Sequence, residues 1–248
     1  MNLLIVLFTA WLSVFSFQPD NPPAPCKNSQ YILAQSKLKY DTDQRWKQSE
    51  FRLHIQEPRV NNPQRYSRVV LNNASSYFEI ERNRSEGTIK RIIDERGSFR
   101  ALFNDNANVP AEIIEKYGIN QQRSQGYRNF YQVMYGLPMS VTKDFYDKMA
   151  PAEPIVFEGK EAYRISLELK QEMISKHWQL IISIEDYALL ALEFYHPENP
   201  EEGEIIKFQD NLRIDNITLP RMRHWYDKQT DEYLGSDIIV TETSQDSY

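Results

Sequence analysis

The sequence predicts an α+β protein in which helices cover one face of a single antiparallel β-sheet, and two observations support this fold class. Residues 177–197 contain two runs of alternating apolar and polar side chains, separated by a turn at residues 185–187. This pattern is typical of a β-hairpin that buries one face. Residues 127–135 carry aromatic side chains at helical spacing, and such a helix supplies the cover that the apolar face needs.

The same alternation extends the predicted sheet upstream. Residues 163–169 add a strand directly before the hairpin, and shorter apolar alternations occupy residues 51–55, 69–71, 78–80 and 89–92. Asn-, Pro- and Gly-containing turns at a spacing of about ten residues are typical of a meandering antiparallel sheet. The sequence lacks the regular alternation of strands and helices that builds a doubly wound nucleotide-binding fold.

The C-terminal part of the chain predicts four more strands, each rich in apolar residues and followed by a polar segment. These predicted strands cover residues 205–208, 212–219, 222–226 and 234–240. Composition does not change between the strands and the helical segment that interrupts them. We therefore expect one domain over residues 29–248.

A helical insert interrupts the strands in the middle of the chain. Asn108 is placed to cap a short helix that has Pro110 in its first turn and Gly118 at its end. The aromatic helix at residues 127–135 follows, and the Gly-Leu-Pro sequence at residues 136–138 ends it. These helices are the expected cover of the apolar face.

The N-terminal segment predicts export. An uncharged apolar run at residues 3–17 has the length of a signal-peptide core and is too short to cross a bilayer of about 30 Å as a helix. We predict a signal peptide over residues 1–17, a proline-rich linker over residues 18–28, and then a helix over residues 29–39 that is capped by Ser29. The expected location is the periplasm or the cell envelope.

Composition excludes several partners and sites. The chain has 29 Lys and Arg against 35 Asp and Glu, a net charge of −6, which argues against nucleic-acid binding. Cys26 is the single cysteine, so an intramolecular disulfide and a cysteine-based zinc site are excluded. The sequence Pro23-Ala24-Pro25 disfavours lipid anchoring through Cys26 but leaves it open. We expect a monomer.

No sequence motif indicates catalysis. The four histidines lack HxxxH spacing, and the GxSxG, GxxxxGK[ST] and GxGxxG signatures are missing. The acidic segment at residues 198–204 lacks the ligand order of an EF-hand, and Glu185 and Asp186 lie at a predicted hairpin tip. We therefore predict no catalytic residues, no metal, no cofactor and no enzymatic activity.

Three segments carry a resemblance to known proteins. FYQVMYGLPMSV, FEGKEAYRISLEL and LPRMRHWYDKQTDEYLGSDII are similar to landmarks of an uncharacterised family of secreted proteins from Bacteroidota. The order of elements resembles the LolA/LolB-like superfamily of periplasmic lipoprotein carriers, over most of residues 40–242. The resemblance implies a strongly curved half-barrel with helices on its concave face and an apolar cavity between them, which the carriers use for acyl chains.

The aromatic stripe and the resemblance together lead to a predicted function. We predict a non-enzymatic exported protein that binds a lipid, lipoprotein or other apolar ligand between the curved sheet and the helical insert. The predicted contacts are Tyr127, Phe130, Tyr131, Met134, Tyr135, Leu137, Met139, Trp178, Leu180 and Ile182. Two alternatives stay open: a cell-envelope structural or interaction protein with a self-filled core and an unknown envelope partner, and a hydrolase assembled from scattered histidines and carboxylates.

Overall fold

The structure is a computed structural model and describes residues 28–196 and 198–243 of the 248-residue chain. The predicted signal peptide (1–17), Cys26 and all but the last residue of the predicted linker (18–28) lie outside the described residues. Among the helices of the described part, none is long and apolar enough to cross a membrane.

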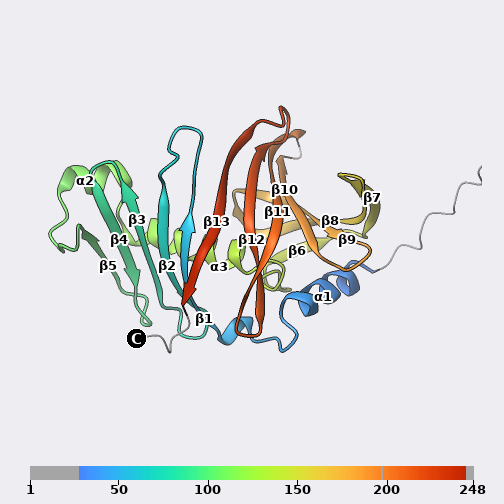
Figure 1. The fold of residues 1–248 in the computed structure, drawn as a ribbon, viewed down its shortest axis with the longest axis horizontal. Coiled ribbons are helices and arrows are strands. Elements are labelled where there is room, and N and C mark those ends of the chain that lie inside the picture. The colour runs from blue at the N-terminus through green and yellow to red at the C-terminus, as the bar shows by residue number, and fades with distance from the viewer. Residues whose placement is uncertain (1–27, 197, 244–248) are drawn as a thin grey trace, which may run out of the picture.

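One antiparallel sheet of thirteen strands dominates the described part of the chain (Figure 1). The strands are β1 (Glu50–Gln56), β2 (Tyr66–Asn72), β3 (Phe78–Arg84), β4 (Gly87–Ile93), β5 (Phe99–Phe103), β6 (Tyr146–Met149), β7 (Glu153–Phe157), β8 (Lys160–Met173), β9 (Ser175–Ser183), β10 (Leu189–His196), β11 (Asn199–Ile214), β12 (Ile217–Asp227) and β13 (Tyr233–Thr243). The helices are α1 (Ser29–Tyr40), the 3-10 turn η1 (Trp46–Gln48), α2 (Ala111–Tyr117) and α3 (Gln121–Tyr135).

The sheet consists of two meanders that meet where β1 pairs with β13. The strand order is β5-β4-β3-β2-β1-β13-β12-β11-β10-β9-β8-β6, and β7 pairs with another part of β8. The outermost strands β5 and β6 do not pair with each other, so the sheet is open. The predicted fold class, an α+β protein with a single curved antiparallel sheet and helices on its concave face, is confirmed.

Helix α3 packs on the concave face. Its Tyr131, Met134 and Tyr135 side chains are each 1% exposed and belong to the main core, together with apolar residues from both meanders. Burial of an apolar side chain of this size contributes about 1.5–3 kcal/mol. The predicted aromatic stripe is therefore the part of the insert that covers the sheet.

The limits of the first two helices differ slightly from prediction. Asn28, and not Ser29, caps α1 through its side-chain oxygen. Pro110 stands at the N-cap of α2 without a side-chain cap bond, so the prediction that Asn108 caps this helix is wrong. Gly118 ends α2 in the left-handed conformation with φ 56°, as its position in the sequence predicts.

Helix α3 is longer than the predicted stripe. It begins at Gln121 and is capped by Asn120, whose side chain accepts a hydrogen bond from the Arg123 backbone N–H. The first two turns contain Gln, Arg, Ser and Gly, which give no apolar periodicity. The helix ends before Gly136, as predicted.

The predicted strands differ from the observed strands in two respects. The C-terminal part forms three long strands instead of four, because residues 212–219 contain the end of β11, a turn at Asp215 and Asn216, and the start of β12. Asp215 has φ 50°, a left-handed conformation that Asp tolerates better than most residues. Strands β5, β6 and β7 were not predicted, because none has a fully buried side chain to produce a clear alternation.

The sheet also buries a smaller area on its other face. Ile181 lies between Leu180 and Ile182 in the alternation of β9 and so faces the opposite side, yet it is 0% exposed and packs with Ala162 and Ala191. Ile155 and Phe157 from β7 pack against the same cluster. The expectation of a single buried face is therefore wrong at this end of the sheet.

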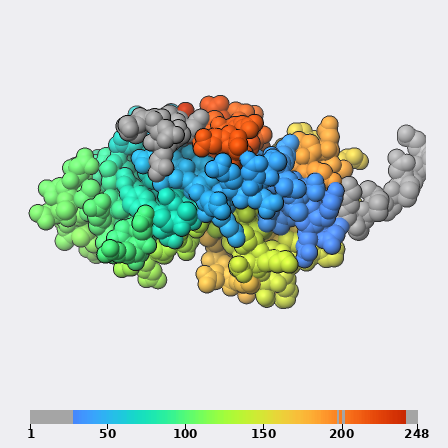
Figure 2. All heavy atoms as spheres, turned by 90° about the horizontal axis from the view of Figure 1, so that it is seen from below, coloured from blue at the N-terminus to red at the C-terminus, as the bar shows by residue number. Residues whose placement is uncertain are grey.

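N-terminal residues cover the lower end of the concave face. Helix α1 lies at the lower end in Figure 1, and Figure 2, seen from that side, shows these N-terminal residues (blue) between the orange-red C-terminal strands and the yellow-green chain that follows α3. Trp46 of η1 is 5% exposed and stacks on Phe51 with ring centroids 5.1 Å apart. The lower end is therefore filled by side chains.

Replacing glycine by alanine should have opposite effects on stability at two positions in and next to α3. A Cβ at Gly136 would lie 2.3 Å from the Trp46 ring and 2.6 Å from the Gln132 carbonyl oxygen, whereas a Cβ at Gly126 would meet nothing within 4 Å. We expect Gly136→Ala to lower the free energy of unfolding by about 1–3 kcal/mol through overpacking. We expect Gly126→Ala to raise it by about 0.5–1 kcal/mol, because Ala favours the helix. Urea unfolding measures both, and equal effects would contradict the close packing of α3 on η1.

Candidate functional site

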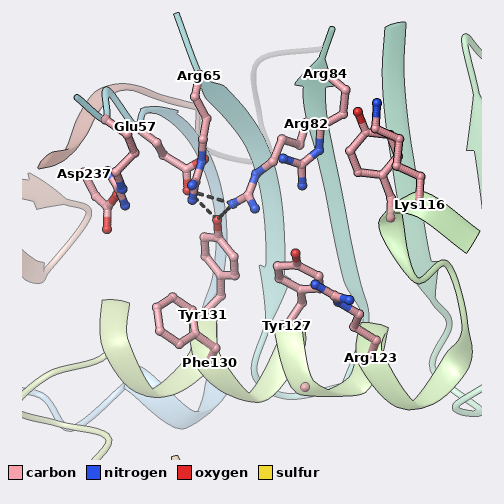
Figure 3. A pocket seen from close by; sticks show the side chains of 13 residues that line it. Glu57, Arg65, Arg82, Arg84, Lys116, Arg123, Tyr127, Phe130, Tyr131 and Asp237 are labelled. Atoms are coloured by element: carbon pink, nitrogen blue, oxygen red, sulfur yellow. Dashed lines mark hydrogen bonds and ion pairs between the residues drawn. The ribbon is translucent and has the colours of Figure 1, made fainter. Parts of the chain in front are cut away.

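A pocket of about 580 Å³ lies between α3 and the sheet, where β1, β2 and β3 end away from α1 (Figure 3). The residues that line it are Glu57, Arg59, Arg65, Arg82, Arg84, Lys116, Tyr117, Arg123, Gly126, Tyr127, Phe130, Tyr131 and Asp237. Six of these side chains are cationic and two are carboxylates, on a chain whose net charge is −6. The pocket is therefore a positive region of an acidic protein.

Glu57 is the centre of an ion-pair network on the pocket wall. Its carboxylate is buried and pairs with Arg82 at 2.8 Å and with Arg65 at 3.2 Å. The hydroxyls of Ser67 and Tyr131 each donate to it at 2.7 Å. Burial alone would raise the pKa of Glu57, but the two guanidiniums and the two hydroxyl donors outweigh burial and lower it. The carboxylate therefore stays charged and ties β1, β2, β3 and α3 together.

The alternation along β3 explains why cations face this pocket. Phe78 and Ile80 are buried in the core, and Arg82 and Arg84 follow at the same two-residue period on the same face. The concave face therefore changes from apolar to cationic within one strand. The Tyr131 hydroxyl from α3 lies at this change and accepts a hydrogen bond from Arg82.

Two other cations of the pocket have acidic partners outside the Glu57 network. Arg59 pairs with the buried Asp237 at 2.6 Å. Lys116 pairs with Glu86, and the Tyr117 hydroxyl donates to the same carboxylate. These pairs hold the hairpin of β1 and β2 and the end of α2 in place around the pocket.

Arg84 and Arg123 have no carboxylate partner among the described residues. The Arg84 Nε is buried without a hydrogen-bond acceptor, and its guanidinium lies over the Tyr117 ring at 5.0 Å. Burial and, after it, repulsion by Arg82 lower the pKa of Arg84. Arg123 is exposed on the first turn of α3. In Figure 3 the labelled Arg84 and Arg123 lie on opposite walls of the pocket, one on the sheet and one on the helix.

Tyr127 lies among these cations. Its ring lies 5.5 Å from the Arg82 guanidinium and 5.2 Å from that of Arg91. Burial alone would raise the pKa of the Tyr127 hydroxyl, but Arg82, Arg84, Arg91 and Arg123 outweigh burial and lower it. Four guanidiniums around one hydroxyl give this part of the pocket a positive potential.

The structure divides the ten predicted contact residues into two groups. Tyr127, Phe130 and Tyr131 line the pocket. The other seven do not line it and are between 0% and 7% exposed in the main core: Met134, Tyr135, Leu137, Met139, Trp178, Leu180 and Ile182. The predicted site and the pocket therefore share only one part of α3.

Sequence reasoning missed the cationic wall of the pocket. The signal was the continuation of the β3 alternation into Arg82 and Arg84, but the net charge of the whole chain hides a local excess. Glu57 directly follows β1 and Asp237 lies within β13, and neither belongs to a motif. Glu57 acts through partners on β3 and α3, and Asp237 through Arg59 in the loop after β1, so both roles depend on contacts between distant parts of the chain.

Metal-ligating side chains do not gather in the part of the chain that the structure describes. No group of three or more His, Cys, Asp or Glu there is placed to hold a metal ion. His224 Nδ1 lies 2.6 Å from the Ser236 hydroxyl, and burial lowers the pKa of this histidine.

Comparison with known proteins shows the family. Residues 23–179, more than half of the chain, match the model described as Family of unknown function (DUF6503). The chain belongs to this family. A comparison with curated proteins gave no match.

Two solved structures share the fold. A LolA superfamily protein from Nitrosomonas europaea has 10% sequence identity and a TM-score of 0.54, over 89% of this chain and 94% of that chain. A putative outer membrane lipoprotein-sorting protein domain from Vibrio parahaemolyticus has 9% identity and a TM-score of 0.50, over 88% and 92% of the two chains. The predicted resemblance to the LolA-like fold is confirmed, and at this identity it shows the fold alone.

The Glu57 network predicts a pH-dependent stability. Replacing Glu57 by Gln leaves the buried Arg82 without its charge partner, so we expect Glu57→Gln to lower the free energy of unfolding by about 3–5 kcal/mol at pH 7. A lowered folded-state pKa adds stability above the usual glutamate pKa of 4.5, and this stability is lost as the pH falls through the folded value. The difference between the wild type and the variant should therefore shrink on acidification.

Urea unfolding at a series of pH values from neutral to strongly acidic measures this difference. Glu172→Gln on the exposed part of β8 is the control, since it removes the same charge at an exposed position. A difference between Glu57→Gln and wild type that does not change with pH would contradict the charged state of Glu57.

Proposed function

We propose that this protein is an exported, non-enzymatic binding protein that holds a lipid, lipoprotein or other apolar ligand between the curved sheet and α3. The observation that carries this proposal is the pocket of about 580 Å³ between these two layers. Ligand pockets commonly measure about 300–1,000 Å³ and are lined by apolar and aromatic side chains with a few polar groups. Tyr127 and Phe130 supply the aromatic part of this pocket.

The shared fold supports the proposal. One solved structure with this fold bears a name that refers to outer membrane lipoprotein sorting. The uncharged run at residues 3–17 supports export of the chain. Together they favour a ligand of the cell envelope.

The chemistry of the pocket supports a binding role more than catalysis. A general base needs a free lone pair within hydrogen-bond reach of a substrate. The Glu57 carboxylate already accepts from Arg82, Ser67 and Tyr131, and Asp237 accepts from Arg59 and from Trp225 Nε1. Both carboxylates of the pocket are therefore engaged in structural bonds.

In this proposal the ligand lies at one end of the helical insert. Tyr135, Trp178 and Leu180 are at most 1% exposed and, unlike Tyr131, do not line the pocket, so a ligand reaches them only when α3 moves away from the sheet. We propose Tyr127, Phe130 and Tyr131 as the contacts in the conformation described here. The remaining predicted contacts belong to the proposal only for an opened state.

A second candidate is a cell-envelope structural or interaction protein, which needs no ligand because its own side chains fill its core. The absence of exposure at Trp178, Leu180 and Ile182 favours this reading for the middle of the sheet. Titration with an apolar probe separates the two candidates, because only a binding protein takes the probe up.

We expect Gly126→Phe to weaken binding of a fluorescent fatty-acid probe by at least about tenfold. Gly126 lines the pocket, and a Cβ there meets nothing within 4 Å, so a phenyl ring occupies the space that a ligand needs. The fold should persist, because Gly is the less favourable residue inside a helix. Fluorescence titration of the purified protein measures the affinity.

Asn129→Phe is the matched control. It adds the same side chain to the exposed side of α3, outside the lining of the pocket. Wild-type affinity of Gly126→Phe would exclude this pocket as the binding site. A wild-type protein that takes up no probe would favour the self-filled interaction protein.

A further inference from the structure

Arg84 places a positive charge in the pocket that no described group neutralises. Its guanidinium has no ion pair, its Nε lacks an acceptor, and it follows Arg82 on the same face of β3. In the described part of the chain its guanidinium lies over the Tyr117 ring, 5.0 Å from the ring centroid. A half-buried guanidinium with a free donor is an unfavourable arrangement unless an acceptor binds to it.

Arg123 adds a second uncompensated charge from the helix side. It lies in the first turn of α3, at the positive end of the helix dipole. Gly118, which has no Cβ, leaves room for this guanidinium, since a Cβ on that residue would lie 2.7 Å from it. The side chain lies beside the end of α2 and lines the pocket.

The groups around these two arginines do not supply an alternative acceptor. The Glu57 carboxylate is engaged by Arg82 and Arg65, and the Asp237 carboxylate by Arg59. Lys116, at the same rim, is paired with Glu86. Arg84 and Arg123 are thus the cations of the lining that remain available to a ligand.

An apolar surface lies beside the two arginines. Phe130 lines the pocket one turn beyond Tyr127 on α3, and its ring packs edge-on against Tyr131 with centroids 5.6 Å apart. Gly126, which presents no side chain, leaves the space between Phe130 and Arg123 open. A ligand in this pocket meets cations at one side and an aromatic surface at the other.

We propose that the ligand is an anionic amphiphile whose phosphate or carboxylate head group is bound by Arg84 and Arg123, with its apolar part against Phe130. This inference rests on the proposed binding function and specifies its ligand class. Guanidinium groups bind oxyanions through charge-assisted, often bidentate hydrogen bonds. A head group between the two walls neutralises both charges.

Isothermal titration calorimetry with four probes tests this ligand class. The probes are dodecyl phosphate, dodecanoate, the neutral monododecanoyl glycerol and inorganic phosphate. We expect the two anionic amphiphiles to bind at least about tenfold more tightly than the neutral one, and their affinity to fall as salt is added. Inorganic phosphate should bind more weakly than dodecyl phosphate, since it lacks the apolar part.

Substitution of the two arginines gives the second comparison. Arg84→Gln and Arg123→Gln should each weaken dodecyl phosphate binding by at least about tenfold and change binding of the neutral amphiphile little. Arg128→Gln is the control, because Arg128 lies on the same helix, has a buried Nε without an acceptor, and does not line the pocket. Urea unfolding checks that the variants remain folded, and Arg84→Gln should be at least as stable as the wild type.

The outcomes distinguish a site for the anionic head group alone from a site for the whole amphiphile. Equal affinity for anionic and neutral amphiphiles, or unchanged affinity in Arg84→Gln and Arg123→Gln, would overturn the head-group assignment and leave the binding function standing. Inorganic phosphate that binds as tightly as dodecyl phosphate would support an anion site and overturn the amphiphile. No binding of any probe would overturn both proposals.

Discussion

Burial of one sheet face beneath α3 is the interaction on which the rest of the structure depends. A thirteen-stranded sheet with an uncovered apolar face would expose a surface that promotes association. Helix α3 covers this face with Tyr131, Met134 and Tyr135, and two contacts fix its C-terminal half. At its C-terminal end the backbone of Gly136 lies against Trp46, and one turn earlier the Tyr131 hydroxyl bonds to Glu57. The pocket is the region beyond this second contact, where the apolar stripe of the helix ends.

Three fully or nearly buried arginines on the concave face are each stabilised by a different local arrangement. Arg82 is neutralised by Glu57. Arg91 donates to the carbonyl oxygens at the C-terminal end of α2, where the helix dipole is negative. Arg223 donates to two backbone carbonyls and lies over the Tyr135 ring at 4.0 Å. Arg223 keeps one buried nitrogen, Nη2, without an acceptor, but Arg84 differs from all three because it has no carboxylate or carbonyl acceptor among the described residues.

The sequence allowed the layers of the fold to be predicted but not the chemistry of the pocket. Strands with buried alternation, such as those around Trp178, were predicted because the period of two is local, and α3 because its aromatic spacing is local. Short strands without a fully buried residue carried no such signal. The pocket combines Glu57 after β1, Arg82 in β3 and Asp237 in β13, and only the pairing of distant strands brings these together. A whole-chain charge of −6 further hides a local excess of cations.

The positive pocket and the acidic chain act on a ligand at different distances. At physiological ionic strength charges are screened beyond about 8 Å, so the potential of Arg84 and Arg123 reaches only a group that has entered the pocket. The net charge of −6 does not attract anions from solution. Entry therefore depends on the burial of an apolar part against Phe130, and retention depends on the head group. A free anion lacks the first interaction and a neutral lipid lacks the second, so the two together select an amphiphile that carries both.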